Sequence, residues 1–106
     1  MYLNLRVSLT PAQTAQKIAE GREWSRKAEH YESLGFFGRA RFYCHLGIDA
    51  LGGNVFLPPD MYKEYIELLE QLCLRRGRLI RKRQRYAASA PEAFVRVYLD
   101  PDPEFD

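Results

Sequence analysis

The chain has few cysteines and no long apolar segment. Its 106 residues contain two cysteines, Cys44 and Cys73, which lie far apart in the sequence. Two widely separated cysteines do not indicate a disulfide framework, so we expect a reducing, cytoplasmic location. No apolar run approaches the length of a membrane span, and the first residues lack the charged and then apolar segments of a signal peptide. We therefore expect no membrane partner.

Motifs of enzymes, cofactor sites and metal sites are also lacking. The sequence contains no phosphate-binding loop, dinucleotide-binding fingerprint or nucleophile elbow. His30, Cys44, His45 and Cys73 are metal ligands by residue type, but their spacing fits none of the paired-ligand zinc patterns. Adjacent residues of a helix point in different directions, which disfavours Cys44 and His45 as a nucleophile and its base. We predict a protein that is not an enzyme, with no catalytic residue, cofactor or metal ligand.

The composition is that of a folded globular protein. Apolar residues make up 46% of the chain and charged residues 28%, close to average usage. The aromatic share of 13% argues against disorder. Four acidic residues set the C-terminal end apart: Asp100, Asp102, Glu104 and Asp106. We expect a single helical domain over residues 1–100 and an acidic tail over residues 101–106.

Hydrophobic periodicity predicts a mainly α-helical protein with short strands at its ends. Apolar and polar residues alternate over residues 3–9 and over residues 95–99, which is the period of a half-buried strand. Residues 55–59 contain apolar side chains and end in two prolines, so we expect a connector that packs on the core. The predicted fold class is a compact domain of three or four helices with short terminal strands.

Start and stop signals place the helices between these strands. Thr10 and Pro11 are typical of a helix N-terminus, but Gly21 leaves open whether the first segment is one helix or two. The expected helical segments are residues 12–34, 37–51 and 61–86. Apolar residues of the last segment share one arc of its helical wheel. Because basic residues then enter that arc, we expect this helix to extend past the core after about Gly77.

One segment carries the pattern of a known repeat family. The tetratricopeptide repeat has Trp, Leu-Gly and Tyr at set spacings, followed by Ala, an aromatic residue and Pro. The corresponding positions here are Trp24, Lys27, Ala28, Tyr31, Ala40, Cys44 and Gly52. Trp, Tyr and Ala are kept, whereas the Leu-Gly pair, the later aromatic residue and the Pro are replaced. Residues 24–52 therefore resemble a single degenerate tetratricopeptide hairpin, which implies two antiparallel helices and a surface for another protein.

Aromatic side chains are concentrated in this hairpin. We expect the contacts with a protein partner to come from Trp24, Tyr31, Phe36 and Phe37. Aromatic residues at helical spacing also form cores, which is the alternative for this group. Phe36 and Phe37 are adjacent at the expected bend, so they cannot both easily face inward. The outward one would belong to an exposed patch for a partner or a second subunit.

Basic residues are concentrated in the second half of the last helix. Seven of the sixteen lie between positions 75 and 85, and no acidic residue interrupts them. Four form a stripe along one face, and a fifth lies beside it: Arg75, Arg78, Lys82 and Arg85, with Arg81. Such a stripe can bind nucleic-acid phosphates or an acidic protein surface. The remaining interpretation is a solvated helix end, neutralised in part by the acidic tail.

Two functions follow from these features. The favoured one is a non-enzymatic adaptor or assembly protein, which binds a protein partner through the hairpin and an acidic surface through the basic helix end. The alternative is a sequence-independent nucleic-acid-binding protein, such as a small subunit of a ribonucleoprotein or mobile-element complex, because phosphate contacts position without specifying sequence. A homodimer joined through the terminal strands is a further arrangement that the sequence allows.

Overall fold

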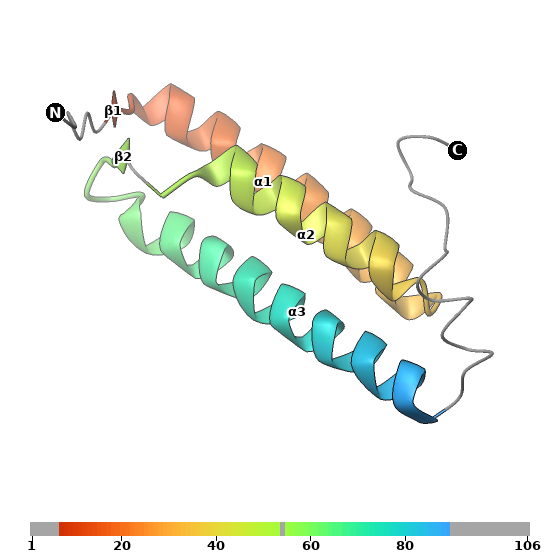
Figure 1. Ribbon diagram of the computed structural model, residues 1–106. Coiled ribbons are helices and arrows are strands. Elements are labelled where there is room, and N and C mark those ends of the chain that lie inside the picture. Colours follow the sequence, from red (N-terminus) through yellow and green to blue (C-terminus); the bar gives the residue numbers. More distant parts are fainter. Residues whose placement is uncertain (1–6, 54, 90–106) are drawn as a thin grey trace, which may run out of the picture.

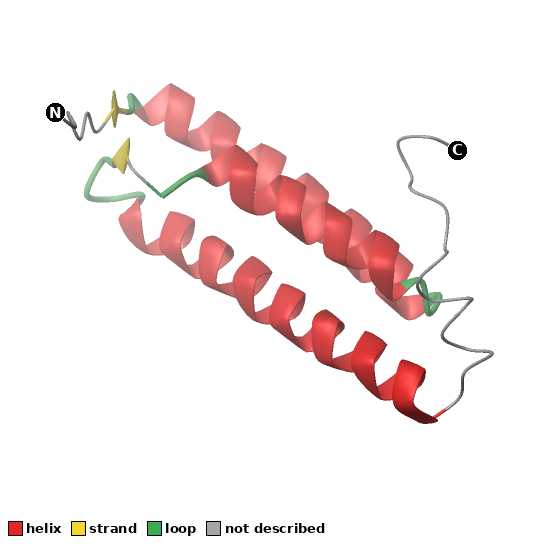
Figure 2. Cartoon of the chain, in the orientation of Figure 1, coloured by secondary structure: helices red, strands yellow, loops and turns green. Residues whose placement is uncertain are grey.

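The computed structural model describes residues 7–53 and 55–89, and this part of the chain folds into three packed helices (Figure 1). The helices are α1 (Pro11–Ser33), α2 (Phe37–Leu51) and α3 (Tyr62–Ser89). Two strands of two residues each, β1 (Val7–Ser8) and β2 (Val55–Phe56), lie together at one end (Figure 2). The predicted helical fold class is confirmed, with three helices in the described chain. The expected strand at 95–99 and the acidic tail lie outside the described residues.

Helix α1 begins at a complete capping box. The backbone N–H of Gln13 donates to Thr10 Oγ1 at 3.1 Å, and the backbone N–H of Thr10 donates to Gln13 Oε1 at 3.0 Å. Pro11 occupies the first turn, where its missing N–H is not needed. The helix then continues unbroken through Gly21 to Ser33, so the first segment is one helix rather than two.

Two glycines allow the helices to approach closely instead of breaking them. A Cβ atom at Gly21 would lie 3.0 Å from Leu68 Cδ2 and 3.2 Å from Leu51 Cγ. At Gly47 it would lie 2.9 Å from Leu72 Cδ1 and 3.2 Å from Trp24 Cβ. Real Cβ atoms rarely come so close to a neighbour. The close approach of neighbouring side chains to the helix backbone, which single-sequence propensity does not detect, therefore favours glycine at both positions.

Short turns connect the elements. Gly35 takes a positive φ of 82° between α1 and α2, and Gly52 takes a φ of 72° after α2, conformations that glycine adopts without strain. The α1–α2 connection makes the two helices antiparallel neighbours (Figure 1). β1 pairs with β2 in parallel, Val7 opposite Val55. The expected connector thus contributes a strand, which pairs with β1, while residues 3–6 of the expected N-terminal strand lie outside the described residues.

Buried side chains form two groups along the helices. One surrounds Tyr65 and Leu72 near the strands, and the other includes Cys44 and Leu79 near the α1–α2 turn. Leu79 is completely buried. The expectation that α3 leaves the core after about Gly77 is therefore wrong, because Leu79 still packs against the hairpin at that level. Within the described chain, no helix combines the length and hydropathy required to cross a bilayer.

Candidate functional site between helices α2 and α3

Two of the aromatic residues predicted to bind a partner stack on Tyr43 of α2. Trp24 and Tyr31 both stack on Tyr43, with ring centroids 5.6 and 5.4 Å apart and interplanar angles of 18° and 17°. Tyr43 is buried, while Trp24 and Tyr31 are half-buried. Lys27 Nζ lies 4.8 Å from the centre of the Trp24 ring. This stack joins α1 to α2, so a large share of the predicted contact surface already has a structural role.

The two phenylalanines at the bend point to different environments. Phe37 is 7% exposed and belongs to the core. Phe36 is half-buried and meets Tyr31 edge-on at 6.5 Å, with the Arg39 guanidinium 5.6 Å from its ring centre. Of this pair, Phe36 alone presents part of its ring to solvent, which agrees with the argument that the two cannot both face inward.

Three members of the basic stripe converge on one carboxylate of α1. Glu32 Oε1 lies 2.7 Å from Arg75 Nη1 and 2.9 Å from Arg78 Nη2, and Glu32 Oε2 lies 2.9 Å from Lys82 Nζ. The Glu32 side chain is only 12% exposed. We name this group, Glu32 with Arg75, Arg78 and Lys82, the Glu32 network. It connects the last turn of α1 to the basic half of α3.

The Glu32 network controls the ionisation of its carboxylate. Burial acts to raise the pKa of Glu32, but hydrogen bonds and charges from Arg78 and Lys82 outweigh it and lower the pKa from 4.5 to about 2. Glu32 is therefore a carboxylate at neutral pH. A negative charge in the last turn of a helix is normally unfavourable, because the helix C-terminus carries partial negative charge. The three cations of α3 offset that cost.

The other two predicted basic residues face elsewhere. Arg81 and Arg85 are both exposed. Neither is part of the Glu32 network. The stripe seen on a helical wheel is thus divided in space: Arg75, Arg78 and Lys82 are turned toward α1, whereas Arg81 and Arg85 are exposed and outside the Glu32 network.

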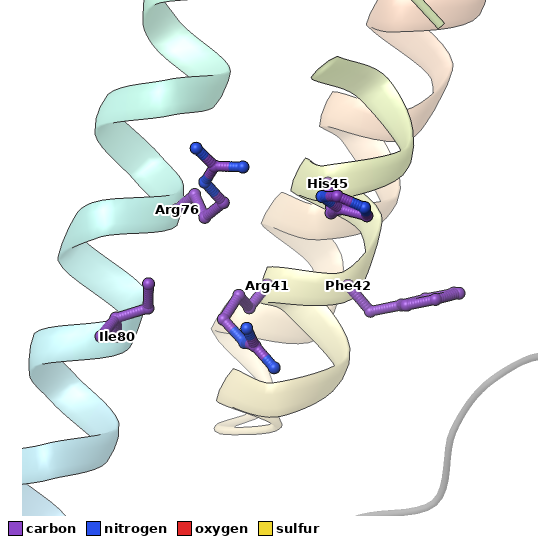
Figure 3. Close-up of a pocket in the computed structure, with 5 residues that line it drawn as sticks. All are labelled: Arg41, Phe42, His45, Arg76 and Ile80. Atoms are coloured by element: carbon purple, nitrogen blue, oxygen red, sulfur yellow. The ribbon is translucent and has the colours of Figure 1, made fainter. Parts of the chain in front are cut away.

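A groove opens between α2 and α3 on the side away from the Glu32 network. It has a volume of about 380 Å³ and is lined by Arg41, Phe42, His45, Arg76 and Ile80. Figure 3 shows Arg76 and Ile80 on α3 facing the α2 residue Arg41 across this groove. We name this feature the α2–α3 groove. None of its lining residues was among the predicted site residues.

The charged side chains that line the α2–α3 groove, in the described part of the chain, are the two arginines Arg41 and Arg76. Arg41 is exposed and Arg76 is half-buried, and within the described chain neither has a carboxylate within ion-pair distance. Among the residues that the structure describes, no acidic one lines the groove. At its end, His45 Nε2 lies 3.3 Å from Asp49 Oδ2. Ile80, which is 38% exposed, places apolar surface beside the two guanidinium groups. An anion with an adjoining apolar group is the complementary ligand.

Sequence reasoning missed this groove because its two arginines lie on different helices. Arg41 lies between Ala40 and Phe42 in the hairpin, and Arg76 is one of the basic residues that enter the apolar arc of the last helix. Its position on the apolar arc was the available signal. That arc faces α2 as well as the core, and the long stem of arginine lets its charge reach the surface there.

The two cysteines differ in their burial. Cys44 is buried and Cys73 is exposed, and both are free thiols. In the portion covered by the structure, no three residues of a metal-binding type come together.

Comparison of the chain with protein-family models, curated proteins and solved structures gives no match. The geometry of its own residues is therefore the basis for assigning a function.

Proposed function

We propose that this protein is a non-enzymatic adaptor or assembly protein that binds an acidic, amphipathic segment of a protein partner in the α2–α3 groove. The observation that carries this proposal is the pairing of Arg41 and Arg76 across the groove without a carboxylate of the described chain, beside the exposed surface of Ile80. Glutamate or aspartate side chains of the partner would form hydrogen-bonded ion pairs with these guanidinium groups. An adjoining apolar side chain would cover Ile80.

The hairpin supports this function mainly as a scaffold. Ala28 and Ala40 are completely buried where α1 meets α2, and the Trp24–Tyr43–Tyr31 stack fixes the two helices side by side. These small residues and aromatics fit a tetratricopeptide-like use of residues 24–52, which we retain as part of the proposal. Trp24, Tyr31 and Phe36 remain candidates for additional partner contacts along the half-buried edge of the stack.

The nucleic-acid alternative has weaker support. Three of its five predicted contacts, Arg75, Arg78 and Lys82, already bind Glu32. Phosphate binding draws its energy from releasing counterions at accessible cations, and an arginine engaged by a carboxylate releases fewer. The apolar wall of the α2–α3 groove also favours a protein partner, because a sugar–phosphate backbone offers little apolar surface to Ile80.

Fluorescence anisotropy tests the proposal with a defined probe. The probe is a labelled peptide of about 15 residues in which glutamates and leucines alternate at helical spacing. One control peptide has glutamine for every glutamate, and a second has alanine for every leucine. We expect the first control to lose binding and the second to bind more weakly, because the groove combines charge with apolar surface.

Two matched charge reversals on α3 locate the site. Arg76→Glu lies in the groove, whereas Arg81→Glu makes the same change on an exposed face outside it. We expect Arg76→Glu to weaken peptide binding about tenfold or more and Arg81→Glu to change it less than about threefold. Equal losses in the two variants, or no binding of the acidic peptide at about 50 mM salt, would overturn the proposal. Circular dichroism establishes that both variants are folded.

A further inference from the structure

The Glu32 network is a second site where anions meet cations, and its anion is supplied by the protein. Arg78 donates hydrogen bonds to both oxygens of the Glu32 carboxylate, with its Nη2 atom lying 2.9 Å from Oε1 and 3.1 Å from Oε2. Arg75 and Lys82 add one hydrogen bond each. This arrangement of guanidinium and ammonium groups is the one that binds phosphate oxygens in nucleic-acid complexes. Glu32 thus occupies the position that a phosphate would take.

The network retains a positive charge that makes such competition relevant. It combines one carboxylate with three cations, and Arg78 is 46% exposed while Lys82 is 32% exposed. The exposed Arg81 and Arg85 continue the positive surface toward the end of α3. A polyanion would be attracted to this face, but contact with Arg75 and Arg78 requires it to displace Glu32.

We propose that Glu32 is a built-in competitor that keeps nucleic acid from the basic face of α3 and so restricts the protein to its acidic protein partner. The contact is intramolecular, so the carboxylate is always present at high effective concentration. Glu32 is a specificity-determining residue rather than a residue of the α2–α3 groove, which lies on the other side of α3. The inference therefore goes beyond the proposed function and is tested separately.

The test compares two neutralising substitutions on the same helix. Glu32→Gln removes the competing charge, whereas Glu29→Gln makes the same change one turn earlier at an exposed residue. Each variant is titrated by fluorescence anisotropy with a labelled oligothymidine of about 20 nucleotides and with a duplex of about 20 base pairs, at about 50 and 200 mM salt. Circular dichroism at the titration temperature shows whether each variant is folded, and Glu32→Asp serves as a second variant that keeps the charge.

We expect Glu32→Gln to bind both probes about tenfold or more tightly than the unmodified protein at the lower salt concentration, with a steeper salt dependence because more cations contact phosphates. Glu29→Gln should change affinity less than about threefold, and Glu32→Asp should resemble the unmodified protein. Equal effects of Glu32→Gln and Glu29→Gln would overturn the proposal, since the gain would then reflect net charge alone. Tight nucleic-acid binding by the unmodified protein would also overturn it.

The same variants separate this inference from the proposed function. Glu32→Gln should bind the acidic peptide within about twofold of the unmodified protein, because its substitution leaves Arg41 and Arg76 in place. A gain in nucleic-acid binding without any peptide binding would support the role of Glu32 and contradict the adaptor function. Peptide binding without a gain in nucleic-acid binding would do the reverse.

Discussion

Helix α3 has basic residues on two sides, and the two sides differ in what they contact. Toward α1, Arg75, Arg78 and Lys82 share the carboxylate of Glu32. Toward α2, Arg76 faces Arg41 across a groove that no acidic residue of the described ranges 7–53 and 55–89 lines. Arg75 and Arg76 are adjacent in sequence, yet one is held within the fold and the other borders an open groove. Charge density along a sequence therefore does not show which charges a partner can reach.

The difference between the two sides has an energetic basis. Glu32 is 12% exposed and Arg75 is 22% exposed, so either one without the other would leave a poorly solvated charge. Arg41 is instead exposed and keeps much of its hydration, although no carboxylate in the described part of the chain lies within ion-pair distance of it. The side toward α1 is thus committed to stability. The side toward α2 can gain free energy from an external carboxylate, which is the property expected of a binding site.

Truncation of the buried Leu79 in the basic half of α3 should have the largest effect on stability. It loosens the packing that supports both the Glu32 network and the α2–α3 groove. Leu79 is fully buried, whereas Leu74 on the same helix is 72% exposed. We expect Leu79→Ala to lower the free energy of unfolding by about 2–5 kcal/mol and Leu74→Ala to change it by less than about 0.5 kcal/mol. Urea denaturation followed by circular dichroism measures both. Similar small effects would mean that α3 leaves the core near Gly77 after all.

The Glu32 network should make stability depend on pH in acid. The pKa of Glu32 is lowered from 4.5 to about 2 in the folded protein. A lowered pKa means that the contribution to stability is fully present above about pH 4.5 and is lost as the pH falls toward about 2. Allowing for solvent around the half-exposed Arg78, we expect this contribution to be about 2 kcal/mol at neutral pH.

Urea denaturation of Glu32→Gln at several pH values isolates that contribution. The variant should be less stable than the unmodified protein by about 2 kcal/mol near pH 7, and the difference should shrink steadily below about pH 4.5. Glu29→Gln, which is exposed, controls for the general effect of removing one carboxylate. If the stability difference between Glu32→Gln and the unmodified protein stays constant down to about pH 2, it arises from the packing of the side chain at position 32 and not from its ionisation.

Much of the fold was predictable because local signals and tertiary packing agree. Thr10 and Pro11 predicted the start of α1, and the expected second helix at 37–51 matches α2 in full. The prediction failed where packing overrides a local rule. Gly21 leaves the helix intact because Leu51 and Leu68 approach its backbone. In the connector, two residues of apolar sequence were too few to indicate a strand without knowledge of its partner β1.

The sites were less predictable because they depend on residues far apart in the sequence. Glu32 contacts cations 43 to 50 positions later, and no local spacing relates them. Helical-wheel reasoning correctly grouped Arg75, Arg78 and Lys82 on one face of α3. It could not show that this face meets the last turn of α1 instead of solvent. The α2–α3 groove required the antiparallel register of two helices, which periodicity alone does not provide.

The two cysteines allow a local comparison of the core with the exposed surface of α3. Burial raises the pKa of the Cys44 thiol to about 11, although the charge of Arg75 acts to lower it. Cys44 is completely buried, whereas Cys73 is exposed on α3. Because the thiolate is the reactive form, we expect iodoacetamide to modify Cys73 about a hundredfold or more faster than Cys44. Mass spectrometry of the time course measures both rates.

Cys73 can then report on occupancy of the α2–α3 groove. It lies three residues before Arg76, which places the two on the same face of α3. A bound acidic peptide should slow modification of Cys73 about threefold or more, and the Arg76→Glu variant should show no such protection. Protection that persists in Arg76→Glu would place the peptide elsewhere on α3. Fast modification of Cys44 in the free protein would contradict the packing of α2 against α3, on which both the groove and the Glu32 network depend.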